Sequence, residues 1–165
     1  MAHAHHKAEA REAVRAWVIT CSDSRTEETD TSGALIRELL DKDGHTVLGG
    51  RIVSDNPEKI GEAIAEARAA KAQVIITNGG TGISPRDSTY EVVAKLLDKR
   101  IDGFGELFRS LSYKEIGSAA MMSRAVAGVS GGAVIIAVPG SRNAVRLAME
   151  DLVLPEIRHM AWLLK

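Results

Sequence analysis

The residues best suited to bind an anion form a glycine-rich segment, Gly79-Gly80-Thr81-Gly82. It follows an apolar run, residues 73–77, that has the length of a strand. Glycines at the end of a strand let backbone N–H groups approach a phosphate, because no Cβ stands in the way. The segment matches neither a dinucleotide-binding fingerprint nor a Walker A loop, so its spacing leaves phosphate binding and a plain tight turn equally open.

Charged side chains follow this segment at Arg86 and Asp87. Arginine suits phosphate oxygens and aspartate suits Mg²⁺. Asp55 is a second carboxylate at the end of a predicted strand, and the two together would hold Mg²⁺ on a triphosphate if they meet. The alternative is that Asp55, together with Asn56, caps the helix that begins at Pro57, and that Asp87 or Ser88 caps the helix that follows it.

Two other features have plainer interpretations. The turn at residues 139–141 could contact a phosphate, but a strand-to-helix connection with a serine cap is favoured. Cys21 stands too close to Arg25 for a phosphatase loop and has no histidine nearby in the sequence, so we expect a small buried hydrophobic residue. His45 and His159 are the only histidines outside the N-terminal tail, so histidine acid–base chemistry is not expected.

Alternating strands and helices must position these segments. Apolar runs predict buried strands at 16–21, 45–53, 73–77 and 133–138. Helical spacing predicts helices after the cap at 30–32 until Gly44, at 57–70, 90–97, 104–111 and 116–127, and from 143 with a break at Pro155 before 157–164. Met121 and Met122 are expected to pack on a helix face.

Strands separated by helices connect as crossovers rather than hairpins, which predicts an α/β fold, a three-layer α/β/α arrangement with a mostly parallel central sheet. Ligands bind beyond the carboxyl ends of such strands, and this rule selects the loops 22–31, 78–88 and 139–143. Residues 1–14 are expected to be a flexible tail whose three histidines have no metal role, and residues 15–165 a single domain.

The composition of the 165 residues excludes several classes of protein. With 45% hydrophobic and 26% charged residues, the chain is typical of a globular protein and not of a disordered one. The net charge of −1 makes nucleic acid a poor partner. The sequence contains no apolar run of membrane-spanning length and no secretory signal, and its single cysteine fits a reducing compartment, so we expect a cytoplasmic location.

The segment from Thr77 to Thr89 resembles the TxGGTGxxxRDxT signature of the molybdopterin-binding MoaB/MogA family. The agreement extends to residues 22–25, 30–33, 122–128 and 139–141, and segments 103–109 and 113–117 resemble the MoaB branch. One departure is Tyr90, where loops of the family usually carry proline. Several ordered motifs make this resemblance more specific than any single one.

The resemblance implies molybdenum cofactor biosynthesis, by ATP-dependent adenylylation of molybdopterin with release of pyrophosphate. Asp55 and Asp87 match the catalytic carboxylates that hold Mg²⁺ beside ATP. Retention of Arg86 and Asp87 favours an active member of the family. The residues that match the molybdopterin- and ATP-binding motifs are Ser22, Asp23, Ser24, Gly79, Gly80, Thr81, Gly82, Arg86, Ser123, Pro139, Gly140 and Ser141.

Two other functions stay open at this point. One is a non-catalytic molybdopterin carrier or scaffold on the same fold, and the other is a different nucleotide-binding α/β protein. Members of the family are trimers or dimers of trimers, which implies a homotrimer or hexamer here, with other molybdenum cofactor biosynthesis proteins as further candidate partners.

Overall fold

A computed structural model describes residues 12–165, and residues 1–11, most of the predicted tail with its three histidines, lie outside the described residues. Val14, the last residue of that predicted tail, is buried, and its carbonyl accepts a hydrogen bond from the Thr46 N–H. The elements are β1 (Arg15–Cys21), α2 (Thr31–Lys42), β2 (Thr46–Val53), α3 (Pro57–Ala69), β3 (Val74–Asn78), α4 (Thr89–Leu96), β4 (Lys99–Arg100), α5 (Asp102–Ile116), the 3₁₀-helix η1 (Gly117–Met122), β5 (Val126–Ser130), β6 (Ala133–Val138), α6 (Arg142–Ala148), the π-helical turn η2 (Met149–Val153) and α7 (Leu154–Trp162).

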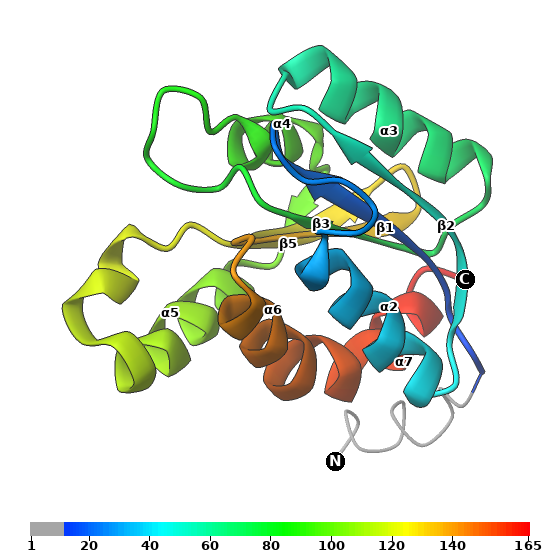
Figure 1. The fold of residues 1–165 in the computed structure, drawn as a ribbon. Helices are drawn as coiled ribbons and strands as arrows, with labels where there is room; N and C mark the ends of the chain where they lie inside the picture. Colours follow the sequence, from blue (N-terminus) through cyan, green and yellow to red (C-terminus); the bar gives the residue numbers. More distant parts are fainter. Residues whose placement is uncertain (1–11) are drawn as a thin grey trace.

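The strands form one sheet in the order β2-β1-β3-β6-β5-β4. Strands β2, β1, β3 and β6 are parallel, whereas β5 and β4 pair antiparallel. Helices α3 and α4 cover one face, and α2, α5, α6 and α7 cover the other (Figure 1). The predicted three-layer α/β/α architecture with a mostly parallel sheet is therefore confirmed.

The core consists of two apolar clusters, one on each face of the sheet. Alternate residues of the central strands feed them: Ile76 and Ile136 face one cluster, and Ile75 and Ile135 face the other. Strands β3 and β6 are buried along their whole length, as their continuous apolar runs predict.

The predicted helix over 116–127 is wrong. The chain there leaves α5, makes the 3₁₀-helix η1 and then enters strand β5, which forms a hairpin with β6. Gly131 and Gly132 both have positive φ, 55° and 81°, the backbone conformation that a two-residue hairpin turn requires. Not every connection is thus a crossover, and Met121 and Met122, at 80% and 49% exposure, do not pack on a helix face.

The predicted break at Pro155 is a change of helical geometry. Proline has no N–H to donate, and a π-helical turn precedes it, so α6 passes through η2 into α7 without leaving the helical path.

The sheet register brings the predicted loops together. Thr20 is paired with Asn78, and Asn78 with Val138, so β1, β3 and β6 end at the same level. Cys21 is paired with Val53, which places the loop after β2 at this edge as well. No helix among residues 12–165 has the length and apolar character to cross a membrane.

Candidate functional site

A pocket of about 270 Å³ lies at the carboxyl ends of β1, β3 and β6, where the three predicted loops meet. Of the residues predicted for the site, it is lined by Ser22, Gly79, Gly80, Thr81, Gly82, Asp87, Pro139 and Gly140. Six further residues line it: Arg25, Asp30 and Asn78 lie in the predicted ligand-binding loops and Ser32 in the motif at 30–33, whereas Thr20 and Cys21 at the end of β1 were missed as site residues.

The turn at Gly79 and Gly80 shapes this pocket. Both residues have positive φ, 91° and 66°, which glycine adopts without strain. A Cβ on Gly79 would collide with the Cys21 carbonyl oxygen, and a Cβ on Gly80 would collide with Asp55 Oδ1. Only residues without a Cβ can form this turn and leave room for the Asp55 carboxylate.

The carboxylates of Asp55 and Asp87 flank the glycine segment. Asp87 Oδ2 accepts a hydrogen bond from the Ser84 N–H at 2.9 Å and lies 2.7 Å from the position that a Cβ on Gly82 would take. Asp55 Oδ1 is buried and has no hydrogen-bond partner. Burial raises the pKa of Asp55, and the nearby Asp87 and Asp23 carboxylates raise this pKa further. A cation at this place would relieve both effects.

Asp55 lies behind Gly80 and does not itself line the pocket, and Asp23 and Arg86, which lie beside Asp55, do not line it either. Their side chains form an ion pair between the loops after β1 and β3. Asp23 Oδ1 also accepts a hydrogen bond from the Asp55 N–H at 3.1 Å. The guanidinium lowers the pKa of Asp55, which opposes the stronger effect of burial.

Three predicted site residues have other surroundings. The Ser24 N–H donates to Ser22 Oγ at 3.2 Å. Ser141 caps α6, since its Oγ accepts from the Ala144 N–H at 3.2 Å, as the plainer interpretation of this turn predicts. Ser123 directly follows η1 and does not line the pocket.

Arg124 supports the glycine segment from the side and was missed by the sequence reasoning. Its Nε donates to the Thr81 carbonyl at 2.9 Å and its Nη2 to the Gly82 carbonyl at 2.6 Å. The guanidinium forms an ion pair with Glu91, which lowers the pKa of Glu91, and lies 4.8 Å from the centre of the Tyr90 ring. Tyr90, the departure from the family pattern, thus provides a surface for Arg124. The motif at 122–128 contained Arg124, but no spacing indicated its contacts.

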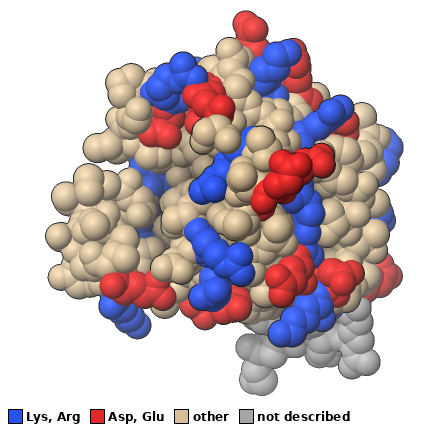
Figure 2. Space-filling view, viewed as in Figure 1, with Lys and Arg blue, Asp and Glu red and all other residues tan. Residues whose placement is uncertain are grey.

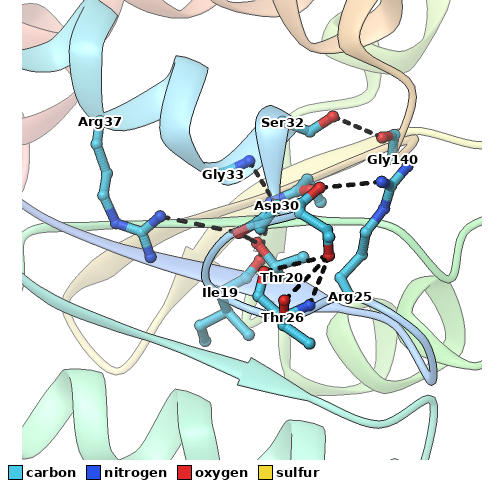
Figure 3. A network of polar contacts seen from close by, with 11 residues as sticks. Ile19, Thr20, Arg25, Thr26, Asp30, Ser32, Gly33, Arg37 and Gly140 are labelled. Carbon is cyan, nitrogen blue, oxygen red and sulfur yellow. Dashed lines mark hydrogen bonds and ion pairs between the residues drawn. The ribbon is translucent and has the colours of Figure 1, made fainter.

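A buried polar network joins the loop after β1 to the ends of β1 and β3. Figure 3 shows Asp30 and Thr20 at its centre, with Ser32 reaching Gly140. Asp30 caps α2, since its Oδ1 accepts from the Gly33 N–H at 2.8 Å, as predicted for this segment. Asp30 Oδ2 accepts from the Thr20 hydroxyl at 2.7 Å, and Thr20 Oγ1 accepts from the Asn78 amide at 3.0 Å. Ser32 extends the network to the third loop by donating to the Gly140 carbonyl at 2.8 Å.

Cys21 behaves as the predicted buried hydrophobic residue. Burial raises the pKa of its thiol to about 12. A thiol with such a pKa is protonated at neutral pH, so it is not a nucleophile for this pocket.

Within residues 12–165, no group of three histidine, cysteine or acidic side chains could hold a metal ion by itself. Magnesium, however, is commonly bound by one or two carboxylates together with substrate phosphates and water. The unpartnered oxygen of Asp55 and the nearby carboxylate of Asp87 fit that mode of binding.

The geometry of the turn predicts opposite effects for two glycine substitutions. Gly80→Ala is expected to lower the free energy of unfolding by about 2–4 kcal/mol, because of its positive φ and the collision with Asp55. Gly61→Ala is the matched control: it lies inside α3 with nothing within 4 Å of its Cβ, and should raise this free energy by about 0.5–1 kcal/mol. Urea unfolding measures both, and equal values for the two variants would contradict the account of the turn.

The raised pKa of Asp55 predicts a pH-dependent change in stability. An ionised carboxylate whose pKa is raised by folding destabilises the folded state at pH values above that pKa. Asp55→Asn should therefore raise the Tm by about 2–4 °C at pH 7. The gain should disappear as the pH falls and the wild-type carboxyl becomes protonated. Calorimetry at pH 7 and in acid tests this, with Asp41→Asn on the exposed side of α2 as control; a lower Tm at pH 7 would refute it.

Comparison with known proteins identifies the family of the chain. The family described as "Probable molybdopterin binding domain" matches residues 17–159. Molybdenum cofactor biosynthesis protein B of Bacillus cereus is 51% identical over 98% of this chain and 97% of its own. A crystal structure of a molybdenum cofactor biosynthesis protein B is 52% identical, with a TM-score of 0.90 over 93% of this chain and 96% of the other. The tungsten cofactor synthesizing protein MoaB from Pyrococcus furiosus is 38% identical, with a TM-score of 0.83 over 90% and 94% of the two chains. The chain belongs to the molybdopterin-binding domain family, and these three similar proteins are MoaB members of that family.

Proposed function

We propose that this protein acts in molybdenum cofactor biosynthesis and adenylylates molybdopterin with ATP. The observation that carries the proposal is the pair of carboxylates, Asp55 and Asp87, on either side of a glycine turn at the edge of a pocket. Membership of the molybdopterin-binding family supports the pterin as substrate. The names of the similar proteins support the cofactor pathway.

In the proposed reaction, an oxygen of the terminal phosphate of molybdopterin forms a bond to the α-phosphorus of ATP. The bond from that phosphorus to the oxygen bridging to the β-phosphate breaks, and pyrophosphate leaves. Phosphoryl-type transfer asks the protein mainly for positioning and for neutralisation of charge. This requirement explains how a pocket without a nucleophilic thiol or a histidine suffices.

The predicted residues that line the pocket or lie beside it have the following places in this proposal. Asp55 and Asp87 hold Mg²⁺, which when bound neutralises charge on the phosphates of ATP. The backbone of Gly79–Gly82, with Thr81, receives phosphate oxygens, as the absence of side chains there permits. Arg86 is exposed, so its guanidinium can exchange the Asp23 carboxylate for a phosphate. Ser22 and Pro139–Gly140 form the remaining walls for the pterin side.

A non-catalytic carrier or scaffold is the second candidate function. The observation that favours it is that the matching family is described by molybdopterin binding alone, which a carrier would also satisfy. A carrier would bind molybdopterin and release no pyrophosphate when ATP and Mg²⁺ are added, whereas the proposed enzyme releases one pyrophosphate for each pterin adenylylated.

Asp87→Asn is expected to lower the rate of pyrophosphate release by about 100-fold or more, because the variant loses a metal-holding charge. Molybdopterin affinity and Tm should change little. Asp41→Asn, an exposed acid of α2, is the matched control and should keep the wild-type rate. A coupled pyrophosphate assay with purified molybdopterin gives the answer, and wild-type turnover by Asp87→Asn would reject the role of Asp87.

We also propose that the protein is a homotrimer or a hexamer that uses the surface of α5 and η1. Large hydrophobic side chains are exposed there, Leu107, Tyr113, Ile116, Met121 and Met122. Figure 2 shows a largely uncharged surface at the left of the view, where Figure 1 places η1. Contiguous exposed apolar surface is typical of protein–protein interfaces.

Charge on this surface should disrupt assembly. The double variant Ile116→Glu/Met121→Glu is expected to elute as a monomer in size-exclusion chromatography with light scattering, since buried unpaired charges are unfavourable in an interface. Leu163→Glu, which places the same charge at another exposed hydrophobic residue, should keep the wild-type mass. A wild-type monomer, or an unchanged mass of the double variant, would contradict the proposal.

A further inference from the structure

A second cavity, of about 340 Å³, lies at the opposite edge of the sheet from the glycine pocket. It is located at the amino ends of the central strands, where Arg15 begins β1, Gln73 precedes β3 and Ala133 begins β6. Among residues 12–165, four cationic side chains line it, Arg15, Arg68, Lys71 and Lys165, and no acidic side chain does. Nothing in the proposed reaction uses this cavity.

Most of this positive charge has no anionic partner in the part of the chain that the structure describes. Lys165 forms an ion pair with Glu12. Arg15 Nε donates to the Lys71 carbonyl at 3.2 Å, and Arg68 donates to the Ser130 hydroxyl, so both have neutral partners. Among residues 12–165, no ion pair involves Arg15, Arg68 or Lys71. The nearby Asp98 carboxylate accepts a hydrogen bond from the Gly131 N–H at 2.8 Å.

The backbone around the cavity holds these cations in place. Lys71 has a φ of 62°, and it is the one residue other than glycine with positive φ in the described part of the chain. Asparagine and glycine adopt this backbone conformation more readily than lysine does. The backbone conformation at position 71 therefore does not explain why the residue is a lysine. Arg68 Nε is buried without a hydrogen-bond partner, and its guanidinium lies beside Gly131 of the hairpin turn. A Cβ on Gly132 would meet nothing within 4 Å, so the turn leaves space beside the arginine.

The dipole of α3 explains only part of the cluster. A cation near the carboxyl end of a helix is favourable, which accounts for Arg68 and Lys71. Arg15 comes from β1 and Lys165 from the segment after α7, so the dipole does not account for their approach. Like charges that converge on a hollow repel each other and focus a positive potential into it.

We propose that this cavity binds a small, multiply charged anion that carries phosphate groups. Two guanidinium groups favour phosphate, whose oxygens accept paired N–H donors. The volume is at the lower end of the range for small-molecule sites, which suits a compact anion. The site is separate from the glycine pocket and does not depend on the adenylylation proposed above.

Calorimetric titration with pyrophosphate and with inorganic phosphate tests the proposal, combined with hydrogen–deuterium exchange to locate the bound anion. Pyrophosphate should bind saturably and protect peptides that contain residues 68–73 and 130–133. Lys71→Asn keeps an accepted backbone conformation, and Arg15→Gln keeps the strand. Each should weaken the Kd about tenfold through loss of a charge-assisted contact. Lys42→Gln, which removes an exposed cation of α2, is the matched control and should leave the Kd unchanged.

Three results would overturn the proposal. Protection confined to peptides around residues 79–82 would place the anion in the glycine pocket. An unchanged Kd in both Lys71→Asn and Arg15→Gln would show that these cations do not bind it. Equal affinity for citrate and pyrophosphate would remove the preference for phosphate. None of these measurements uses adenylylation, so this site and the proposed enzyme activity fail or succeed separately.

Discussion

The close approach of the Asp55 carboxylate to the backbone of Gly80 is the contact on which the site depends. It exists because Gly79 and Gly80 turn with positive φ and carry no Cβ. The same contact buries Asp55 Oδ1 without a partner and leaves the Asp87 and Asp23 carboxylates nearby, so the pKa of Asp55 is raised. A carboxylate kept in this state favours a cation, and the proposed function follows from that preference.

The rest of the structure holds this turn in position. Below the turn, Asp30, Thr20 and Asn78 form a buried chain of hydrogen bonds from the loop after β1 to the ends of β1 and β3. From outside, Arg124 donates to the carbonyls of Thr81 and Gly82 and is itself fixed by Glu91. Buried polar groups that are hydrogen-bonded make a structure rigid, whereas Asp55 Oδ1, a buried carboxylate oxygen without a partner, marks a place for a ligand.

Features that depend on local sequence could be predicted. The apolar runs gave the buried strands β1, β3 and β6, and Asn56 with Pro57 begins α3 as a cap followed by proline. The glycine turn was found because positive φ and close approach both require glycine. The hairpin of β5 was missed, because the alanines and methionines of 119–125 are spaced like a helix face. Only pairing with β6 selects a strand in the segment that follows them, at 126–130.

Features that depend on tertiary contacts could not be predicted. Arg124 reaches the glycine segment from more than forty positions along the chain, and the ion pair of Arg86 with Asp23 joins two loops. The convergence of Asp55 and Asp87 also needed the register of the strands.

A crystal structure with a non-hydrolysable ATP analogue and Mg²⁺ tests most directly whether Asp55 and Asp87 hold the metal beside the glycine turn. The metal should lie between Asp55 and Asp87, and the phosphates should contact the backbone of Gly79–Gly82. A triphosphate bound away from this turn, with both carboxylates free of metal, would contradict the proposed role of the two carboxylates.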